Sequence, residues 1–365
     1  MSEPVRVAVV GLGWAGREIW LSRLTGHPAY DVVAVADASP AAREAAARVL
    51  PEVRVVADAT ELTPDLVDLA VVAVPNHLHA PVACGLLGRG VSVFLEKPVC
   101  LTSAEAAQLA SAERAAGAVL LAGSAARYRA DVMALRDTVV REAGQIRHVD
   151  VSWVRAKGVP DAGGWFTRGD LSGGGALVDL GWHLLDTVAP LLGPVEYTQV
   201  LGSVSGDFVN AAGHGTSWRH DGDATPAGAG DVEDTARGLL VTSGGVSVAL
   251  RVSWASHEAL DSTTIRVEGS AATVQLRCTF GFSPNRVRSP ALFVTRTGES
   301  TPVPFDPEPV GAEYDRQLDA LPGLLARDGA QGTAVAEARR TIGVIERLYH
   351  SAGRARRAPA VAAAH

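Results

Sequence analysis

The sequence predicts an α/β protein that opens with a doubly wound parallel sheet and continues with a second α/β domain built on a large, open, mainly antiparallel sheet. Short apolar runs alternate with helical stretches as far as residue 122, which is the pattern of parallel strands joined by crossover helices. From about Gly123 the segments with strand character become longer, and glycine-containing turns such as Ser243-Gly244-Gly245 join several of them. That change is typical of antiparallel hairpins.

Length and composition indicate two globular domains. A chain of 365 residues is long for one hydrophobic core, so we expect a first domain over 1–123, a second over 124–353 and a disordered tail over 354–365. Hydrophobic residues make up 47% of the chain and charged residues 20%, which is ordinary for a globular protein. The net charge of −7 provides no basic surface for nucleic acid or for an anionic membrane.

The first strand and the turn after it carry the strongest motif. Residues 5–10 form a short β-branched run, which predicts a strand buried on both faces, and a helix is expected over 14–24. Gly11 would permit the tight turn between them, Gly13 would let the backbone approach a pyrophosphate, and Gly16 would let the helix pack closely. A purely structural glycine turn is the alternative. The expected cofactor contacts in this turn are Gly11, Leu12, Gly13, Trp14, Ala15 and Gly16.

Asp37 follows the second predicted strand, residues 32–36, at about the separation from the glycines that dinucleotide binding requires. Its carboxylate would accept hydrogen bonds from both adenosine ribose hydroxyls and repel a 2′-phosphate, which favours NAD over NADP as the cofactor. A solvated loop acid or a helix cap is the alternative for Asp37. The order of strand, glycines, helix, strand and acid predicts a Rossmann domain.

Further strands and helices alternate after Asp37. Ligands of such a sheet bind outside the carboxyl ends of the strands, and residues 75–79 and 96–98 fall there. The expected elements are helix 40–50, strand 53–57, strand 69–74, helix 80–87, strand 91–95, helix 103–116 and strand 119–122.

Lys97 is the first residue expected to take part in chemistry. It stands at the end of a strand beside the expected nicotinamide position, and Pro98 forces it out of helical geometry and could follow a cis bond. A lysine desolvated near a cationic nicotinamide ring has its charged form disfavoured, so it could exchange a proton near neutral pH. A strand end with a solvated Glu96–Lys97 pair is the alternative.

A second candidate group lies on the helix expected after Gly173-Gly174-Gly175. Asp179, His183 and Asp186 are spaced four and three apart, which places them on one helical face among leucines. Ionisable groups on a buried helix are costly unless they pair or act in catalysis, and histidine is suited to proton transfer at neutral pH. A satisfied structural histidine with salt-bridged acids is the alternative, and Asp186 is the residue of the three that best fits a structural role.

The second domain is expected to contain a sheet, two closing helices and one long loop. The loop, residues 204–231, carries His214, Trp218 and His220 and could be a substrate lid, a subunit-contact arm or a mobile surface loop with no specific role. The expected strands are 146–154, 198–203, 236–241, 246–254, 264–268, 273–278 and 292–295, and the closing helices are 313–326 and 333–352.

Cysteine use and the amino terminus suggest a reducing compartment. Cys84, Cys100 and Cys278 are too few and too scattered for a disulfide framework, and no spacing suggests a metal site. The first residues lack a basic segment followed by an apolar one, and no apolar run reaches membrane-spanning length. We therefore expect a cytoplasmic protein.

These motifs together resemble the glucose-fructose oxidoreductase/inositol dehydrogenase/MocA (Gfo/Idh/MocA) family. The resemblance rests on the glycine fingerprint, on Glu96-Lys97-Pro98, on the segment from Gly173 to Asp186, and on Val232-Glu233-Asp234-Thr235-Ala236 followed by a hairpin. It implies an oxidoreductase in which the second domain binds substrate and its open sheet mediates a homodimer or homotetramer. It also implies hydride transfer between nicotinamide and a carbon that bears the substrate oxygen.

The resemblance further implies roles for single residues. Lys97 corresponds to the family's catalytic lysine, Asp179 to its paired aspartate and His183 to its histidine, so that His183 or Lys97 would carry the hydroxyl proton and Asp179 would orient the pair. A plain strand-to-helix turn is the alternative for the residues after the fourth strand. The implied cofactor contacts beyond the glycine turn are Pro75, Asn76, His79, Glu96 and Lys97.

The implied substrate is a polyhydroxylated small molecule: a sugar, a cyclitol or a sugar-containing metabolite such as an aminoglycoside or a nucleotide sugar. Cationic donors and an aromatic face suit a hydroxylated ring, although core packing is an alternative for the aromatic pair. Alternative functions are an NAD-using glycosidase, an imine reductase, or a regulator that senses dinucleotide or sugar without catalysis. The expected substrate contacts are Lys97, Arg127, Tyr128, Arg155, Trp165, Phe166, Asp179 and His183.

Overall fold

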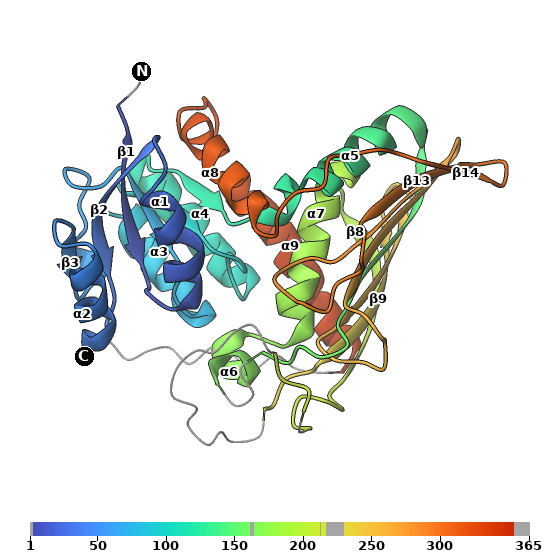
Figure 1. Cartoon of the computed structure of the whole chain (residues 1–365), viewed down its shortest axis with the longest axis horizontal. Coiled ribbons are helices and arrows are strands. Elements are labelled where there is room, and N and C mark those ends of the chain that lie inside the picture. Colours follow the sequence, from blue (N-terminus) through green and yellow to red (C-terminus); the bar gives the residue numbers. More distant parts are fainter. Residues whose placement is uncertain (1–2, 161–163, 212, 217–229, 354–365) are drawn as a thin grey trace. The chain divides into compact units, whose positions relative to one another are not determined.

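The computed structural model describes residues 3–160, 164–211, 213–216 and 230–353, and the tail expected at 354–365 lies outside them (Figure 1). The chain forms two compact units. The first unit consists of Met1–Gly123 and Tyr314–Arg339, and the second of Ser124–Glu313 and Arg340–His365. Among the described helices, none is long and apolar enough to span a bilayer.

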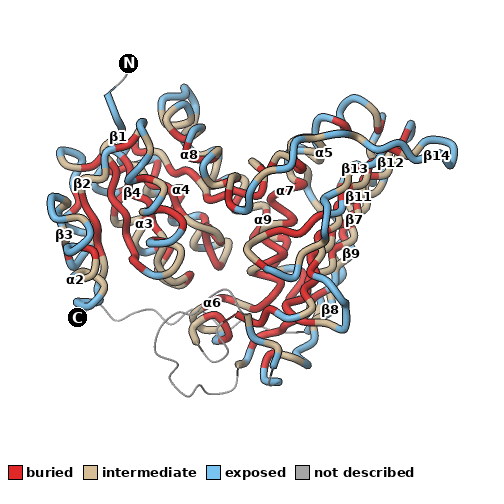
Figure 2. Tube along the Cα trace, in the orientation of Figure 1, coloured by how far each residue is buried: buried red, intermediate tan, exposed pale blue. Residues whose placement is uncertain are grey.

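The first unit contains a six-stranded, wholly parallel sheet with strand order β3-β2-β1-β4-β5-β6, as the sequence predicts. β2 lies on one side of β1 and β4 on the other, so the strand order reverses at β1, and ligands of such sheets bind beside that point at the carboxyl ends of the strands. β1 and β4 are largely or wholly buried because helices cover the sheet (Figure 2). The strands are β1 Val5–Val10, β2 Tyr30–Ala36, β3 Arg54–Val56, β4 Leu69–Val72, β5 Ser92–Leu95 and β6 Leu120–Ala122.

The helices of the first unit follow the predicted positions. The boundary between the two units differs from the predicted one. Residues 314–339 group with the first unit, whereas the sequence analysis assigned them to the second domain. Within this unit, the Tyr30 hydroxyl donates to the carbonyl of Leu318, and the Gln317 side chain donates to the carbonyl of Ala122. The helices are a π-helical turn Ala15–Leu21 that continues as α1 Ser22–Leu24, then α2 Pro40–Val49, α3 His79–Leu87, α4 Ser103–Ala116 and α8 Ala312–Leu325.

The second unit is built on an eight-stranded sheet with order β14-β13-β12-β11-β7-β10-β9-β8. All neighbours are antiparallel except β7 and β10, which run parallel, so the expected mainly antiparallel sheet is confirmed. The strands are β7 Ile146–Val154, β8 Tyr197–Ser205, β9 Thr235–Thr242, β10 Ser247–Ser253, β11 Ser262–Gly269, β12 Thr273–Cys278, β13 Ala291–Arg296 and β14 Glu299–Pro302. The helices are α5 Ala130–Glu142, α6 Gly169–Ser172, a π-helical turn Leu177–Gly181 that continues as α7 Trp182–Leu192, and the part of α9 Thr333–Ser351 that follows Arg339. The sequence analysis did not identify α5 and β14.

The two faces of this sheet differ in what they contact. Gly202 and Gly238 pair across β8 and β9, and a Cβ on Gly238 would lie 2.6 Å from the Leu348 side chain of α9. Their neighbours Leu201 and Leu239 therefore point to the opposite face, where they remain 65% and 46% exposed. The sheet thus packs α9 on one face and presents apolar side chains on the other.

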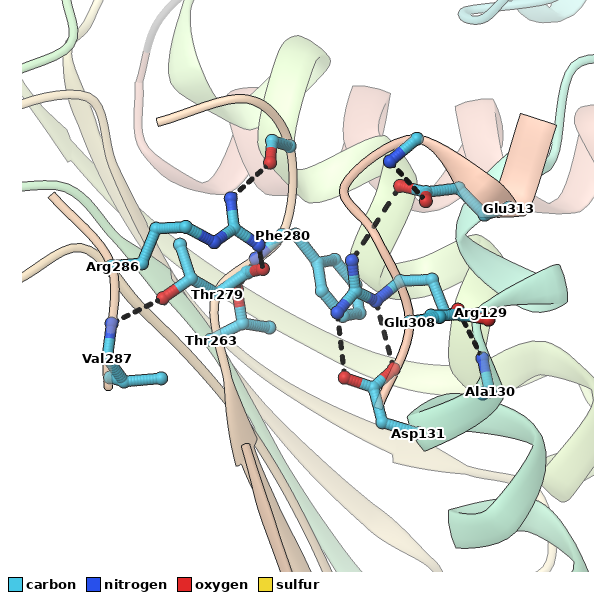
Figure 3. A network of polar contacts seen from close by, with 12 residues as sticks. Arg129, Ala130, Asp131, Thr263, Thr279, Phe280, Arg286, Val287, Glu308 and Glu313 are labelled. Carbon is cyan, nitrogen blue, oxygen red and sulfur yellow. Dashed lines mark hydrogen bonds and ion pairs between the residues drawn. The ribbon is translucent and has the colours of Figure 1, made fainter. Parts of the chain in front are cut away.

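A buried ion-pair network connects the beginning and the end of segment 124–313 in the second unit (Figure 3). The Arg129 guanidinium donates to both oxygens of Asp131, at 2.9 and 2.7 Å, and lies 3.7 Å from Glu313. It also lies over the Phe280 ring, 4.7 Å from the centroid. Glu308 accepts a hydrogen bond from the Ala130 N–H at the start of α5. These contacts satisfy charges that would be costly to bury alone.

His79, which was expected in the cofactor pocket, is buried and connects the segments that follow β4 and β5. The ring is 1% exposed, and its two nitrogens lie 2.7 Å from the Pro98 carbonyl and 2.9 Å from the Val74 carbonyl. A neutral imidazole carries one N–H, so it donates to one carbonyl at a time. Desolvation lowers the pKa of His79 to about 4 and outweighs the two carbonyl contacts, which favour the protonated ring.

This burial predicts a pH-dependent stability. Between about pH 6.5 and 4 the unfolded chain protonates His79 and the folded chain does not, so the free energy of unfolding falls as the pH drops through that window. The contribution is about 3 kcal/mol in full. Denaturant unfolding at pH 7 and pH 4.5 should show a larger loss for the natural chain than for His79→Gln, which has no titrating ring. Equal losses in both proteins would refute the assignment.

Candidate functional site

The glycine turn after β1 has the backbone geometry that the motif predicts. Gly11 has φ +91°, and a Cβ there would lie 2.7 Å from the Ala73 carbonyl oxygen. A Cβ on Gly16 would lie 1.8 Å from the carbonyl oxygen of Gly11, so the helix can approach the turn only with glycine. A Cβ on Gly13 would meet no atom within 4 Å. The turn therefore has room beside Gly13 for the backbone contact with a pyrophosphate.

Asp37 is hydrogen-bonded to this turn. Its Oδ2 accepts from the Leu12 N–H at 2.6 Å, and its Oδ1 accepts from the Ser39 N–H at 2.8 Å. The carboxylate remains half-buried at the carboxyl end of β2, where its remaining lone pairs suit the hydroxyls of a ribose. This geometry fits a dinucleotide, whose phosphates the glycine turn would hold and whose adenosine ribose Asp37 would hold.

The residues after β4 line the same edge of the sheet. Pro75 precedes a short helical turn, Asn76–Leu78, and Asn76 itself is 7% exposed. His79 begins α3 directly afterwards. The sequence thus placed these three residues correctly at a strand's carboxyl end, and their contact with cofactor stays a prediction.

Glu96 links Lys97 to the first helix. Its Oε2 accepts from the Lys97 N–H at 2.8 Å, and its Oε1 accepts from the indole N–H of Trp20, also at 2.8 Å. Trp20 is fully buried, with its ring packed edge-on against Phe94. Desolvation raises the pKa of Glu96, and the Lys97 ammonium opposes that shift. The peptide bond between Lys97 and Pro98 is cis, as the sequence analysis considered.

In the second unit, one helix brings two candidate residues to its accessible side. Between residues 176 and 188, all of which the structure describes, only Asp179 and His183 are not buried. Asp179 lies in the π-helical turn that precedes α7, and such wide turns are frequent at functional sites. The apolar neighbours are buried, as the leucine pattern predicted.

Glu233 anchors the start of this helix. Its Oε1 accepts from the N–H groups of Gly175 and Leu177, both at 3.0 Å, and from the Tyr349 hydroxyl at 2.6 Å. A Cβ on Gly175 would lie 1.7 Å from the Glu233 carbonyl oxygen, so no other residue fits there. The sequence analysis noted the Glu233 segment only as part of the family resemblance. Its role as a buried helix cap needed the structure.

Asp179 has a partner that the sequence analysis missed. The indole N–H of Trp254 donates to its Oδ2 at 2.9 Å. Arg155 contributes a nearby charge: burial lowers the pKa of this guanidinium, and the carboxylates of Asp179 and Asp261 oppose the shift. No spacing rule links Trp254 to a helix 75 residues earlier, and the pairing arises because β10 ends beside the π-helical turn.

Trp153 packs between the predicted substrate residue and the predicted catalytic histidine. The Arg155 guanidinium lies 5.0 Å from a Trp153 ring centroid, and the His183 ring lies 5.6 Å from it. Arg155 also donates to the Gly158 carbonyl at 3.2 Å. The second unit therefore gathers Arg155, Asp179 and His183 around Trp153 and Trp254, and their contact with substrate stays a prediction.

Asp186 belongs to a different group from Asp179 and His183. The Arg127 side chain donates to the Asp186 Oδ1 at 2.7 Å and to the Asp186 carbonyl at 3.0 Å. The Ser124 hydroxyl also donates to Oδ1. Asp186 is 8% exposed. These contacts support the structural role favoured for Asp186 and extend it to Arg127. Tyr128 follows on the same short helical turn, half-buried, and substrate contact by either residue stays a prediction.

The remaining predicted substrate residues, Trp165 and Phe166, precede Thr167, whose carbonyl accepts from the N–H of Asp231 at the end of the long loop. Trp165 and Phe166 stack on one another with centroids 4.0 Å apart. Residues 206–216 of the loop are partly described, and the carbonyl of His214 accepts from the N–H groups of Gly158 and Val159. Trp218 and His220 lie outside the described residues. The described part of the loop is thus docked against the segment that follows Arg155.

Comparisons with known proteins agree with this arrangement. A family model described as "Oxidoreductase family, NAD-binding Rossmann fold" matches residues 5–124, and one described as "GFO/IDH/MocA C-terminal domain" matches residues 135–275. The solved structure of GenD2 from gentamicin A biosynthesis, in complex with NAD, has a TM-score of 0.75 and 24% identity. That similarity covers 97% of this chain and 95% of GenD2, and it shows a shared fold.

Two relatives are similar in sequence. A protein of Amycolatopsis mediterranei (strain S699), named for the oxidoreductase subunit of a UDP-kanosamine synthase, is 58% identical over 359 residues, which cover 98% of this chain and 99% of that protein. The D-glucoside 3-dehydrogenase of Escherichia coli (strain K12) is 31% identical over 199 residues, which cover 53% of this chain and 55% of that protein. The chain belongs to the Gfo/Idh/MocA family of oxidoreductases.

Proposed function

We propose that the chain is an NAD-dependent dehydrogenase that oxidises the 3-hydroxyl of a UDP-linked hexose to a ketone. The observation that carries this is the 58% identity, across both whole chains, with a protein named for the oxidoreductase part of UDP-kanosamine synthesis. Kanosamine is a glucose whose 3-hydroxyl is replaced by an amino group. Placing nitrogen on that carbon first requires the ketone, and the D-glucoside 3-dehydrogenase is named for the same carbon.

Each proposed role in this reaction falls to a named residue. The glycine turn and Asp37 would hold the dinucleotide, which accepts a hydride from the alcohol carbon when it is bound. His183 or Lys97 takes the hydroxyl proton as the carbonyl forms, and Asp179 orients the pair. Arg155 and the Trp165–Phe166 stack supply donors and an aromatic face for the hydroxylated ring.

The use of lysine in this chain supports a proton-exchanging role for Lys97. Of its 33 cationic residues, only Lys97 and Lys157 are lysines, and the others are arginines. Arginine stays charged at any physiological pH, so it cannot exchange a proton, whereas a lysine can. A lysine at the strand end is therefore the cation that suits acid-base chemistry.

The function is tested by incubating the purified chain with NAD and a panel of UDP-glucose, glucose, alkyl glucosides and inositols. Hydroxylamine traps any ketone as its oxime, so that an unfavourable equilibrium does not hide the reaction. We expect NADH equal in amount to the trapped ketone, with UDP-glucose the fastest substrate. Glycoside cleavage without free NADH would indicate a glycosidase instead. Faster oxidation of inositols would contradict the nucleotide-sugar assignment.

Replacing Lys97 should abolish turnover and spare cofactor binding. In Lys97→Ala we expect a loss of about 100- to 10,000-fold in kcat, because the reaction loses a proton-transfer group, with NADH affinity measured by fluorescence near that of the natural chain. Lys157→Ala is the matched control because it removes the other, exposed lysine. Normal turnover in Lys97→Ala would remove this residue from the mechanism.

Replacing Asp37 should relax the choice of cofactor. Asp37→Ser removes the charge that would repel a 2′-phosphate, so kcat/KM with NADP should rise and that with NAD should fall, each by about tenfold. Asp31→Ser, at the exposed opposite end of β2, is the control and should leave the ratio unchanged. Equal use of NAD and NADP by the natural chain would refute the role given to Asp37.

The exposed sheet face supports a homodimer or homotetramer. Leu201 and Leu239 form an exposed apolar pair on the face opposite α9, and apolar patches of this kind mark protein contacts. Light scattering should show a smaller particle for Leu239→Lys than for the natural chain. Val140→Lys, which alters an exposed valine on α5, should keep the natural size. A monomeric natural chain would rule out this interface.

The cytoplasmic location expected from the sequence also stays part of the proposal.

A further inference from the structure

The buried indole N–H of Trp254 donates a hydrogen bond to the carboxylate of Asp179. Trp254 is the residue after β10, and its side chain is fully buried. Its indole N–H lies 2.9 Å from Oδ2 of Asp179, whereas Asp179 itself is only half-buried. A large buried residue outside the predicted site thus contacts the carboxylate that the proposed reaction uses.

The main chain around Trp254 holds the indole in one place. The backbone N–H of Trp254 donates to the Asp234 carbonyl at 2.8 Å. The hydroxyl of the neighbouring Ser253 donates to the Ala255 carbonyl at 2.6 Å. In the β9–β10 ladder, Ser253 pairs with Thr235, and their hydroxyls are 2.7 Å apart. The backbone hydrogen bond and complete burial therefore both restrict the position of the indole.

The chemistry of the indole defines what this contact does. An indole N–H can only donate, so Oδ2 of Asp179 must accept with a free lone pair. The contact therefore fixes the rotation of the carboxylate and favours its ionised form. Hydrogen bonds to a charged group are stronger than those between neutral groups, so the orientation is held firmly.

We propose that Trp254 is a positioning residue, which holds the Asp179 carboxylate in the orientation that serves proton transfer at His183. Its role in turnover rests on the proposed function, whereas the contact itself does not. The simpler reading is that Trp254 only fills volume in the core. The two readings differ in whether the N–H group, rather than the ring, is required.

Two substitutions separate the N–H from the ring. Trp254→Phe removes the donor and part of the volume, and benzothienylalanine at position 254 replaces the N–H by sulfur at nearly constant size. We expect both to lower kcat by about ten- to hundredfold, with NADH affinity unchanged. The acid limb of the pH–rate profile should move to higher pH, because ionised Asp179 has lost a donor. Natural kcat with benzothienylalanine would show that only volume matters.

Coupling between the two residues gives a second kinetic readout. If Trp254 acts through Asp179, Trp254→Phe should cost little further kcat in an Asp179→Asn background. Effects that multiply independently would overturn the proposal. This comparison uses the residual rate of Asp179→Asn, measured at high enzyme concentration.

A spectroscopic readout tests the contact without any turnover. With ¹⁵N-tryptophan labelling, the chain's seven tryptophans give separate indole signals, and Trp254→Phe identifies the signal of Trp254 by its absence. Its shift should follow pH in the natural chain and lose that dependence in Asp179→Asn. A signal that ignores both pH and Asp179→Asn would refute the contact. Failure of the sugar assay alone would refute only the proposed function.

Discussion

A buried carboxylate on Glu233 is the constraint on which the second unit's candidate site depends. Its Oε1 accepts from two backbone N–H groups at the start of the helix and from a tyrosine hydroxyl of α9, and these three donors offset the cost of burying the charge. The same close approach excludes a side chain at Gly175. These contacts fix the start of the helix, on which Asp179 and His183 are the residues between 176 and 188 that are not buried.

In the first unit, carboxylates also accept hydrogen bonds from backbone N–H groups. Asp37 accepts a backbone N–H from the glycine turn, and Glu96 accepts one from Lys97. Each carboxylate thereby connects the end of a strand to a segment that would contact cofactor. In both units a tryptophan indole holds a carboxylate of the candidate site, Trp20 in the first and Trp254 in the second. Fixed donors of this kind pre-organise charges before a ligand arrives.

Local patterns were sufficient for much of the fold. The β-branched run 5–10, the three glycines and Asp37 all act within forty residues, and backbone sterics alone dictate their arrangement. Segments of strand character joined by glycine-containing turns predicted β7 to β13, because hairpins need turn residues at their ends. The helix α5 was not predicted, and β14 was not predicted because all four of its residues are exposed. β14 pairs only with β13, the strand directly before it, so no apolar face marks it in the sequence.

The sequence by itself determined the dinucleotide-binding motif, the strand-end position of Lys97 and the shared helix of Asp179 and His183, because each depends on spacing within one or two elements. Only the tertiary structure decided that Asp186 pairs with Arg127, that His79 is enclosed by carbonyls, and that Trp254 reaches Asp179. These contacts join residues from different elements, and their partners depend on how sheets and helices pack. Spacing along the chain carries no information about such packing.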